Sequence, residues 1–212
     1  MKYKAIAFCL ALVMTAPRAS HANDTVRFAP LPPDQLTQQQ KAWVDAIAAP
    51  PRNAKYNNPP FRAYTRNPDL ASRIIAMADY LRWNSSLPAR LSELAILVTA
   101  RQWTAQYEWF AHYPLAIKAG LDPQVAADIA RGVRPEKMKD DEAALYDLAI
   151  ALYRDKKVSD DVYKAALDKF GERGIMDVIG IIGFYDITSM TLITMQAGAP
   201  NDSVPPLPAL PK

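Results

Sequence analysis

Cysteine and histidine are almost absent from this chain of 212 residues. Cys9 is the only cysteine, and His21 and His112 are the only histidines. One cysteine forms no disulfide within a chain, and two imidazoles without a thiolate do not complete a typical zinc or iron site. The composition therefore excludes a disulfide scaffold and disfavours a metal centre. Few side chains are left for chemistry near neutral pH.

The first 22 residues have the pattern of an export signal. They combine a positive start, an apolar stretch over residues 5–16 and small residues on both sides of His21. The stretch of about 12 residues is too short to span a bilayer. A bulky residue precedes Cys9 where a lipoprotein signal needs a small one. We expect cleavage after Ala22 and a periplasmic or secreted protein, with no lipid anchor.

The charge balance gives no sign of a polyanionic partner. The whole chain has 25 Lys and Arg against 22 Asp and Glu, but Lys2, Lys4 and Arg18 fall within the signal, which leaves 22 of each sign. A neutral protein has no general electrostatic attraction to nucleic acid or to anionic membranes. We therefore expect a small-molecule partner, no nucleic acid and no membrane insertion after signal removal.

Proline marks the two ends of the chain. Five prolines fall within residues 200–212, and seven lie between residues 30 and 60. We expect a proline-rich arm with a short helix over residues 23–60, a helical domain over 61–199 and a proline-rich tail over 200–212. Both ends are predicted to be extended. They either lie on the surface or grip a neighbouring subunit.

Glycine is missing from the first 119 residues. This excludes a glycine-rich phosphate loop or a dinucleotide fingerprint in that half. No sustained period-2 alternation is bounded by hairpin turns, so the predicted fold class is all-α, a helical bundle. Four glycines follow apolar periodic runs and are interpreted as helix stops: Gly120, Gly132, Gly171 and Gly198.

Caps and apolar spacing locate the helices. Asn67-Pro68-Asp69 opens a helix that runs to about Trp83. Its predicted apolar face contains Leu70, Ile74, Met77 and Leu81. Leu87-Pro88 opens the next helix, and Thr104 is expected to cap the one after it, which ends near Ala119. Further helices are predicted over residues 123–131, 140–154, 159–170 and 175–197.

The stretch over residues 175–197 is nearly continuous in apolar residues. Its length suits a membrane span, but Asp177 and Asp186 interrupt it, and each would be costly in hydrocarbon. A helix buried on most faces, inside a bundle or an oligomer, explains the pattern better. So much apolar surface on a small helical domain favours a homo-oligomer.

His112 is the one imidazole outside the export signal, and it lies one helical turn after Glu108. Residues four apart share a helix face, so the carboxylate can hold the imidazole and make it a proton carrier near its reference pKa of about 6.5. Arg90, Glu93 and Arg101 lie on the preceding predicted helix, from which some can face this turn. The alternative is a surface ion pair, or a core histidine satisfied by Glu108.

Three segments resemble the carboxymuconolactone decarboxylase family. They are Leu87-Pro88-Ala89-Arg90-Leu91-Ser92-Glu93-Leu94, then Tyr107-Glu108-Trp109-Phe110-Ala111-His112, and Gly183-Phe184-Tyr185-Asp186, which resembles the family's Gly-x-Tyr-Asn. The resemblance covers roughly residues 61–198. It implies an alkylhydroperoxidase D-like helical fold that assembles as a homotrimer or homohexamer, with pockets near the subunit boundaries.

The same superfamily includes disulfide reductases with a Cys-x2-Cys-x3-His helix and a glutamate on the helix before it. By this resemblance, Glu93 matches the glutamate and His112 the histidine, while Ala105 and Glu108 stand at the cysteine positions. Thiol-dependent peroxidase chemistry requires a thiolate and is therefore excluded.

The resemblance implies decarboxylase-like chemistry without a cofactor. His112 would exchange a proton, Glu108 and Glu93 would tune or relay it, and Arg90 or Arg101 would orient an anionic substrate. Further substrate contacts are expected from Tyr107, Trp109 and Tyr185. The expected reaction is proton transfer, decarboxylation or isomerisation of a small lactone or carbonyl acid. The alternatives are a non-catalytic binding module of the same fold and an oxidative-stress or metal-handling protein.

Overall fold

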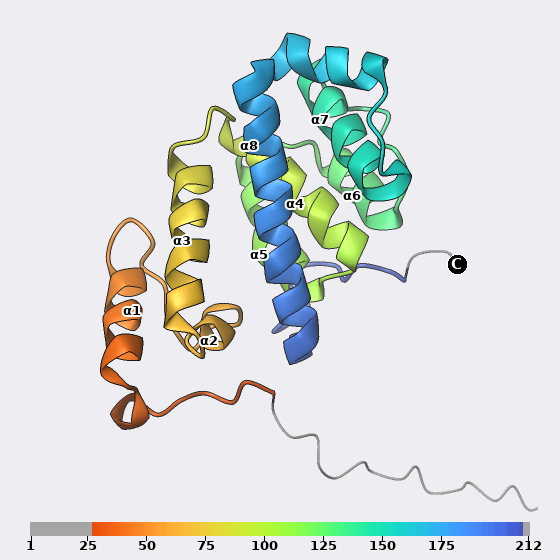
Figure 1. Ribbon diagram of the computed structural model, residues 1–212. Helices are drawn as coiled ribbons and strands as arrows, with labels where there is room; N and C mark the ends of the chain where they lie inside the picture. Colours follow the sequence, from red (N-terminus) through yellow and green to blue (C-terminus); the bar gives the residue numbers. More distant parts are fainter. Residues whose placement is uncertain (1–26, 210–212) are drawn as a thin grey trace, which may run out of the picture.

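The computed structural model describes residues 27–209, and the predicted signal over residues 1–22 lies outside them. Within the described residues the protein is entirely helical, which confirms the predicted fold class (Figure 1). A 3-10 turn at Pro33–Gln35 precedes the first α-helix, and a π-helical turn at Ala151–Asp155 follows α7. The α-helices are α1 (Gln38–Ala48), α2 (Phe61–Tyr64), α3 (Pro68–Trp83), α4 (Ala89–Trp103), α5 (Gln106–Lys118), α6 (Pro123–Arg131), α7 (Asp140–Ile150) and α8 (Asp160–Met195).

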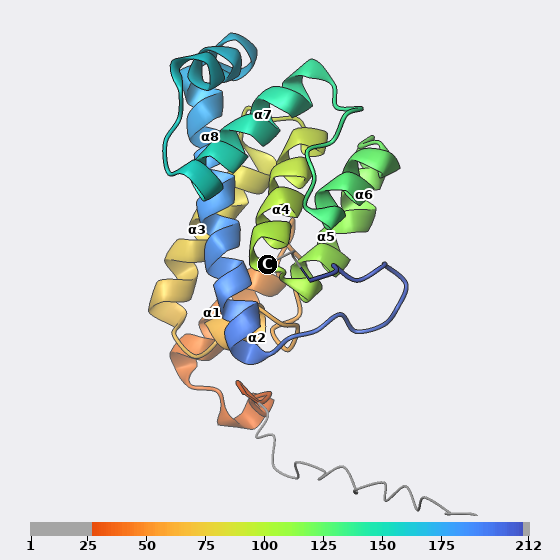
Figure 2. The same cartoon turned by 90° about the vertical axis from the view of Figure 1, so that its right-hand side faces the viewer.

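Helices α4 and α8 form the centre of the bundle. Helix α4 packs against α5, α6, α7 and α8, and α8 also contacts α3 and α5 (Figures 1 and 2). Ten residues of α4 are buried, including Leu91, Leu94, Ala95 and Val98, whose i, i+3, i+4, i+7 spacing places them on one face. Because α4 is surrounded, the residues along it reach several different neighbours.

Two predicted helix starts are confirmed by their caps. The Asn67 side chain accepts a hydrogen bond from the Leu70 amide at the start of α3, and Asp122 caps α6 through the Gln124 amide. Helix α6 ends at Gly132, whose φ of 73° lies in the left-handed region that glycine adopts without strain. Local sequence signals are sufficient to place these ends.

Other boundaries differ from the predictions. Thr104 does not cap α5; it ends α4 in the left-handed conformation with φ 52°, and α5 begins at Gln106. The two helices predicted over residues 159–170 and 175–197 are the two parts of α8, and the backbone between them is non-helical at Gly171, the predicted helix stop, with φ 62°. Helix α8 ends at Gln196, with φ 59°, before Gly198. Thr104 after α4 and Gln196 after α8 thus take the left-handed conformation without being glycine, so the positions of the glycines alone do not predict these helix ends.

The buried face of α3 is rotated from the predicted one. Leu70 and Met77 are exposed, whereas Ile74 and Leu81 are buried as expected. The small residues of this helix take the missing core positions: Ala71 and Ala78, both buried against the bundle. The buried face of α3 therefore combines alanines with Ile74, Ile75 and Leu81 instead of following its largest apolar side chains.

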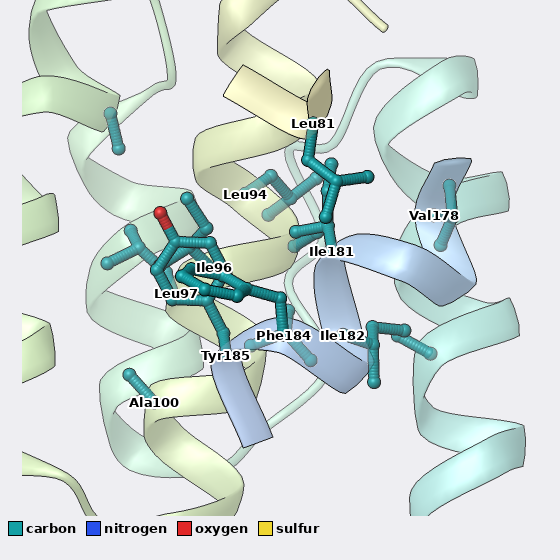
Figure 3. Packing of buried hydrophobic residues seen from close by; sticks show 14 of the residues in the cluster. Leu81, Leu94, Ile96, Leu97, Ala100, Val178, Ile181, Ile182, Phe184 and Tyr185 are labelled. Atoms are coloured by element: carbon teal, nitrogen blue, oxygen red, sulfur yellow. The ribbon is translucent and has the colours of Figure 1, made fainter. Parts of the chain in front are cut away.

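The apolar run of α8 is explained by its central position. Val178, Ile181 and Ile182 pack with Leu94 and Leu97 of α4 and with Leu81 of α3 (Figure 3). By length and composition α8 is apolar enough to cross a membrane, but half of its most apolar window is buried inside the protein. Fully burying one such side chain stabilises a fold by about 1.5–3 kcal/mol. The run therefore fits a core helix.

The two aspartates of α8 have polar partners. Asp177 accepts hydrogen bonds from the Tyr80 hydroxyl at 2.9 Å and from the Ser86 amide at 2.7 Å. Asp186 accepts one from the Tyr153 hydroxyl at 2.6 Å. The buried Asp177 and the half-buried Asp186 thus tie α8 to its neighbours.

Both ends of the described chain pack against its own helices. Trp43 and Ile47 of α1 are buried in the core. At the other end Leu207 is buried, and its amide and carbonyl both bond to the Gln106 side chain, at 2.9 and 2.8 Å. We expected extended ends on the surface or on a neighbouring subunit, but here they complete the bundle.

Candidate functional site

Glu93 and His112 lie on neighbouring helices joined by a tight turn. Helix α4 carries Glu93, and α5 returns alongside α4 with Glu108 in its first turn and His112 one turn later. The imidazole lies between the two carboxylates. Its Nδ1 is 2.6 Å from Glu93 Oε2, and its Nε2 is 3.2 Å from Glu108 Oε1. All three residues are buried.

The two carboxylates determine the charge of His112. Burial by itself would lower the imidazole pKa, but the hydrogen bonds and negative charges of Glu108 and Glu93 outweigh it and raise the pKa to about 9. His112 is therefore protonated at neutral pH. From the sequence we expected a proton carrier near the reference pKa, whereas in the structure the imidazole keeps its proton at neutral pH.

The three residues face a cavity of about 750 Å³, a size typical of small-molecule sites. Five helices and the loop before α2 contribute to its wall, with side chains that include Lys55, Tyr64, Arg82, Glu93, His112 and Tyr185. The Tyr185 ring meets the imidazole edge to face, with 5.1 Å between the ring centres. The imidazole is thus shielded from bulk water and open to a ligand.

Tyr107 and Tyr185 both line this cavity, where the sequence placed them as substrate contacts. Burial raises the pKa of each phenol, and the negative charge of Glu108 raises it further. Both hydroxyls therefore stay protonated at neutral pH. They are available as hydrogen-bond donors to a ligand.

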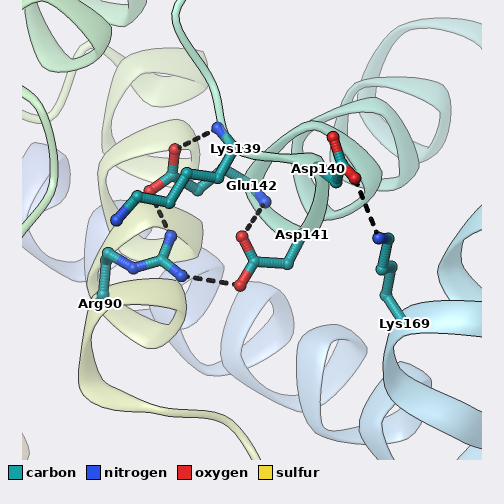
Figure 4. A network of polar contacts seen from close by, with 6 residues as sticks. All are labelled: Arg90, Lys139, Asp140, Asp141, Glu142 and Lys169. Atoms are coloured by element: carbon teal, nitrogen blue, oxygen red, sulfur yellow. Dashed lines mark hydrogen bonds and ion pairs between the residues drawn. The ribbon is translucent and has the colours of Figure 1, made fainter.

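Arg90 lies in a different part of the molecule. It pairs with Asp141 at 2.7 Å and with Glu142, which join α4 to the start of α7 (Figure 4). Glu142 also accepts a hydrogen bond from the Lys139 amide at 2.8 Å. Arg90 does not line the cavity. The interpretation of Arg90 as the cation that orients a substrate beside His112 is not supported by this position.

Arg101 and Trp109 are also outside the cavity wall. Arg101 is 1% exposed and donates to the carbonyls of Ala130 and Pro208, at 3.3 and 2.6 Å. The Trp109 ring is buried in the core against Tyr113. The substrate roles expected for these two residues are corrected: one binds backbone and the other fills the core.

Other cations line the cavity instead. Arg82 ends α3, while Arg52 and Lys55 belong to the loop between α1 and α2. Arg82 lies next to Trp83, the predicted end of its helix, and this position is a weak sequence signal for a cation near the site. No local pattern marks Arg52 or Lys55, because only the folding of the proline-rich segment onto α3 brings them to the site.

Neither metal ligation nor thiol chemistry is indicated by the side chains present. Among residues 27–209 there is no cluster of three or more His, Cys, Asp or Glu side chains arranged to hold a metal ion. Residues 27–209 contain no cysteine, and Glu108 presents an oxygen acceptor to the imidazole.

Residues 68–149 match the carboxymuconolactone decarboxylase family. One similar solved structure is an uncharacterized peroxidase-related protein from Silicibacter sp. TM1040, with a TM-score of 0.60, 18% identity, and coverage of 89% of this chain and 96% of that chain. Another, from Agrobacterium tumefaciens, is a protein of unknown function proposed as the antioxidant defence protein AhpD. It has a TM-score of 0.59 and 15% identity, over 66% of this chain and 97% of that chain. No curated protein matches the chain.

At these identities the solved structures establish the fold alone. The family match spans α3 to α7, which includes Glu93, Glu108 and His112. Over residues 68–149 the chain thus matches the carboxymuconolactone decarboxylase family model, and its fold is similar to that of the two solved structures; the matched segment contains no cysteine.

Proposed function

We propose that this protein is a cofactor-free enzyme that transfers a proton to a small lactone or carbonyl acid, in a decarboxylation or an isomerisation. One observation carries the proposal: an imidazole held between two buried carboxylates faces a cavity of ligand size. Such an imidazole is a positioned acid, and general acid catalysis contributes about 10²–10⁴-fold to a rate.

The two carboxylates have different roles in the proposal. Glu93, at 2.6 Å from Nδ1, fixes the ring orientation. Glu108, at 3.2 Å from Nε2, makes the longer contact and lies on the same helix. We assign proton delivery to the Nε2 side, where Glu108 accepts from the imidazole.

In a decarboxylation the bond between a carbon and its carboxylate breaks, and its electron pair moves into the conjugated carbonyl. Carbon dioxide leaves, and the resulting enolate carbon takes a proton from the His112–Glu108 pair. Solvent then returns one proton to the imidazole. The net change consumes one proton and needs no oxidant or reductant, which fits a site built from oxygen and nitrogen acids.

Export and assembly are further proposals. Export rests on the signal pattern of residues 1–22, and it implies a substrate other than that of the namesake cytosolic enzyme. A homotrimer or homohexamer is supported by apolar side chains that α8 leaves exposed, Met176, Ile179, Met190 and Ile193. Light scattering on the purified protein measures the assembly, and a monomer at micromolar concentration would contradict it.

The reaction is tested in deuterium oxide with 3-oxo acids and lactone acids that carry a second carboxylate. We expect release of carbon dioxide and deuterium on the carbon that lost it. Glu108→Gln keeps the side-chain shape but removes one charge, so it should slow the reaction without unfolding the protein. Deuterium incorporation at the same rate in His112→Gln would contradict the proposal.

A binding module of the same fold is the competing function. It predicts that ligands protect the protein against heat and are recovered unchanged. Binding of these acids without turnover would therefore support that alternative and reject the enzyme.

A further inference from the structure

The charges on the cavity wall are separated. Glu93, His112 and Glu108 lie on α4 and α5 and together carry one net negative charge when the imidazole is protonated. The cations Arg52, Lys55 and Arg82 belong to α3 and to the loop before α2. An anionic ligand is repelled by the carboxylates and attracted by the cations. The cavity therefore has a negative side at α4 and α5 and a positive side at α3 and the loop before α2.

The three cations are not equally available. Arg52 pairs with Asp79 and lies over the rings of Phe61 and Trp83, at 5.9 and 5.1 Å from their centres. Its charge is already compensated. Within residues 27–209 neither Arg82 nor Lys55 forms an ion pair. Arg82 and Lys55 therefore supply the uncompensated positive charge of the wall.

Arg82 and Tyr185 line the same cavity, and Tyr185 reaches its catalytic end. The Tyr185 ring extends from α8 toward α4 (Figure 3) and meets His112. Burial raises the pKa of the phenol, and the interaction with Arg82 opposes that rise. A guanidinium and a neutral phenol both donate hydrogen bonds, and together they suit a carboxylate.

We propose that Arg82 and Tyr185 form a carboxylate-binding subsite that holds one end of the substrate while His112 faces its reacting carbon. The carboxylate held there is a spectator. A group that leaves as neutral carbon dioxide would lose its attraction to Arg82 during the reaction, which would oppose decarboxylation.

The substrate class follows from the rest of the wall. Between the two polar ends lie apolar side chains, among them Leu81, Leu87, Ile96 and Phe184. A flat or cyclic apolar body fits this middle section, with the spectator carboxylate at one end and the reacting group at the other. In a decarboxylation, the leaving carboxylate lies at the reacting end, where the negative charges of Glu93 and Glu108 repel it until it departs as neutral carbon dioxide. The subsite itself rests on geometry, whereas its catalytic orientation rests on the proposed function.

Binding of benzoate and of its uncharged counterpart benzamide tests the subsite. Calorimetry or the fluorescence of Trp83, which lines the cavity, reports either ligand. We expect the wild-type chain to bind benzoate at least tenfold more tightly than benzamide. Arg82→Met should abolish that preference, Arg82→Lys should retain part of it, and Tyr185→Phe should weaken benzoate binding about fivefold.

Arg73→Met is the matched control, because Arg73 is exposed on the same helix and lies outside the cavity wall. It should bind benzoate as the wild type does. Equal affinity for benzoate and benzamide in the wild type, or an undiminished benzoate preference in Arg82→Met, would overturn the subsite.

The same variants separate this inference from the proposed function. His112→Gln should keep the benzoate preference, since the imidazole does not hold the carboxylate. With a turned-over acid, Arg82→Met should raise KM more than it lowers kcat. A benzoate preference without any turnover would retain the subsite and reject the enzyme. Turnover with an unchanged KM in Arg82→Met would instead support the enzyme and reject the subsite.

Discussion

Arg101 and His112 are two buried cations eleven residues apart in sequence, on α4 and α5, and they are held in different ways. His112 lies between two carboxylates and faces a cavity. Arg101 donates to two backbone carbonyls and to the Thr104 hydroxyl, and it lies in the last turn of α4. Desolvation lowers the pKa of Arg101, but a guanidinium stays charged in proteins.

The partners decide what each cation is able to do. A carboxylate accepts a proton and returns it, so His112 can exchange its proton with a ligand. A carbonyl accepts a hydrogen bond without taking the proton, so Arg101 can only hold chain segments together. One of the two carbonyls belongs to Ala130 in the last turn of α6, where the helix dipole also favours a positive charge. Burial of charge alone therefore does not identify a catalytic group.

The largest expected effect is on turnover at His112. His112→Gln should lower kcat by about 10²–10⁴-fold, because the positioned acid is lost. Single-turnover kinetics on the identified acid measures the change. The comparison would fail if Arg101→Met, in its folded fraction, lost as much activity as His112→Gln.

Arg101→Met should act on stability. The change leaves the carbonyls of Ala130 and Pro208 without a donor inside the protein, which should cost about 3 kcal/mol of unfolding free energy. Urea unfolding measures it, with exposed Arg73→Met as a control expected within about 0.5 kcal/mol of the wild type. An Arg101→Met chain as stable as the wild type would show that the buried guanidinium holds nothing together.

The pH dependence should report His112 and not Arg101. The folded pKa of about 9 is above the unfolded value, so the stabilisation from His112 is complete below about pH 6.5 and is lost as the pH rises through 9. The loss is on the order of 3 kcal/mol. Activity should fall over the same alkaline range, and Glu108→Gln should move that fall to lower pH. Unfolding curves from pH 6 to 10 that do not change would contradict this assignment.

The smallest expected effect concerns the tail that Arg101 holds. Leu207→Ala removes a buried side chain at the end of the chain and should cost about 2 kcal/mol. Turnover should change little, because Leu207 lies outside the cavity wall. Differential scanning calorimetry measures the stability change. A drop in kcat with unchanged stability would instead connect the tail to the site.

The helices and the pairing of His112 with Glu108 could be predicted from the sequence, because both depend on local spacing. Asn67-Pro68 marks a helix start within a few residues, and the Glu108–His112 pair follows from the helical repeat. Spacing alone left Glu93 as one of three candidates on the preceding helix, and the family resemblance singled it out, because it meets His112 across two helices.

The cations were assigned incorrectly because their partners are distant in sequence. Arg90 finds Glu142, 52 residues further on, and Arg101 finds Pro208, 107 residues further on. Arg82 reaches the cavity wall only because α3 and the loop before α2 pack over it. Tertiary packing determines which arginine is free and which is paired, and the spacing of residues along the sequence does not predict it.

The protonation state of His112 tests the account most directly, and the chain has only one other histidine to distinguish from it. Nuclear magnetic resonance of the imidazole carbons from pH 5 to 11, with His112→Gln to assign the signals, gives the pKa in the folded protein. The account expects a midpoint near 9, set by Glu93 and Glu108. A midpoint at or below the ordinary value of about 6.5 would contradict it.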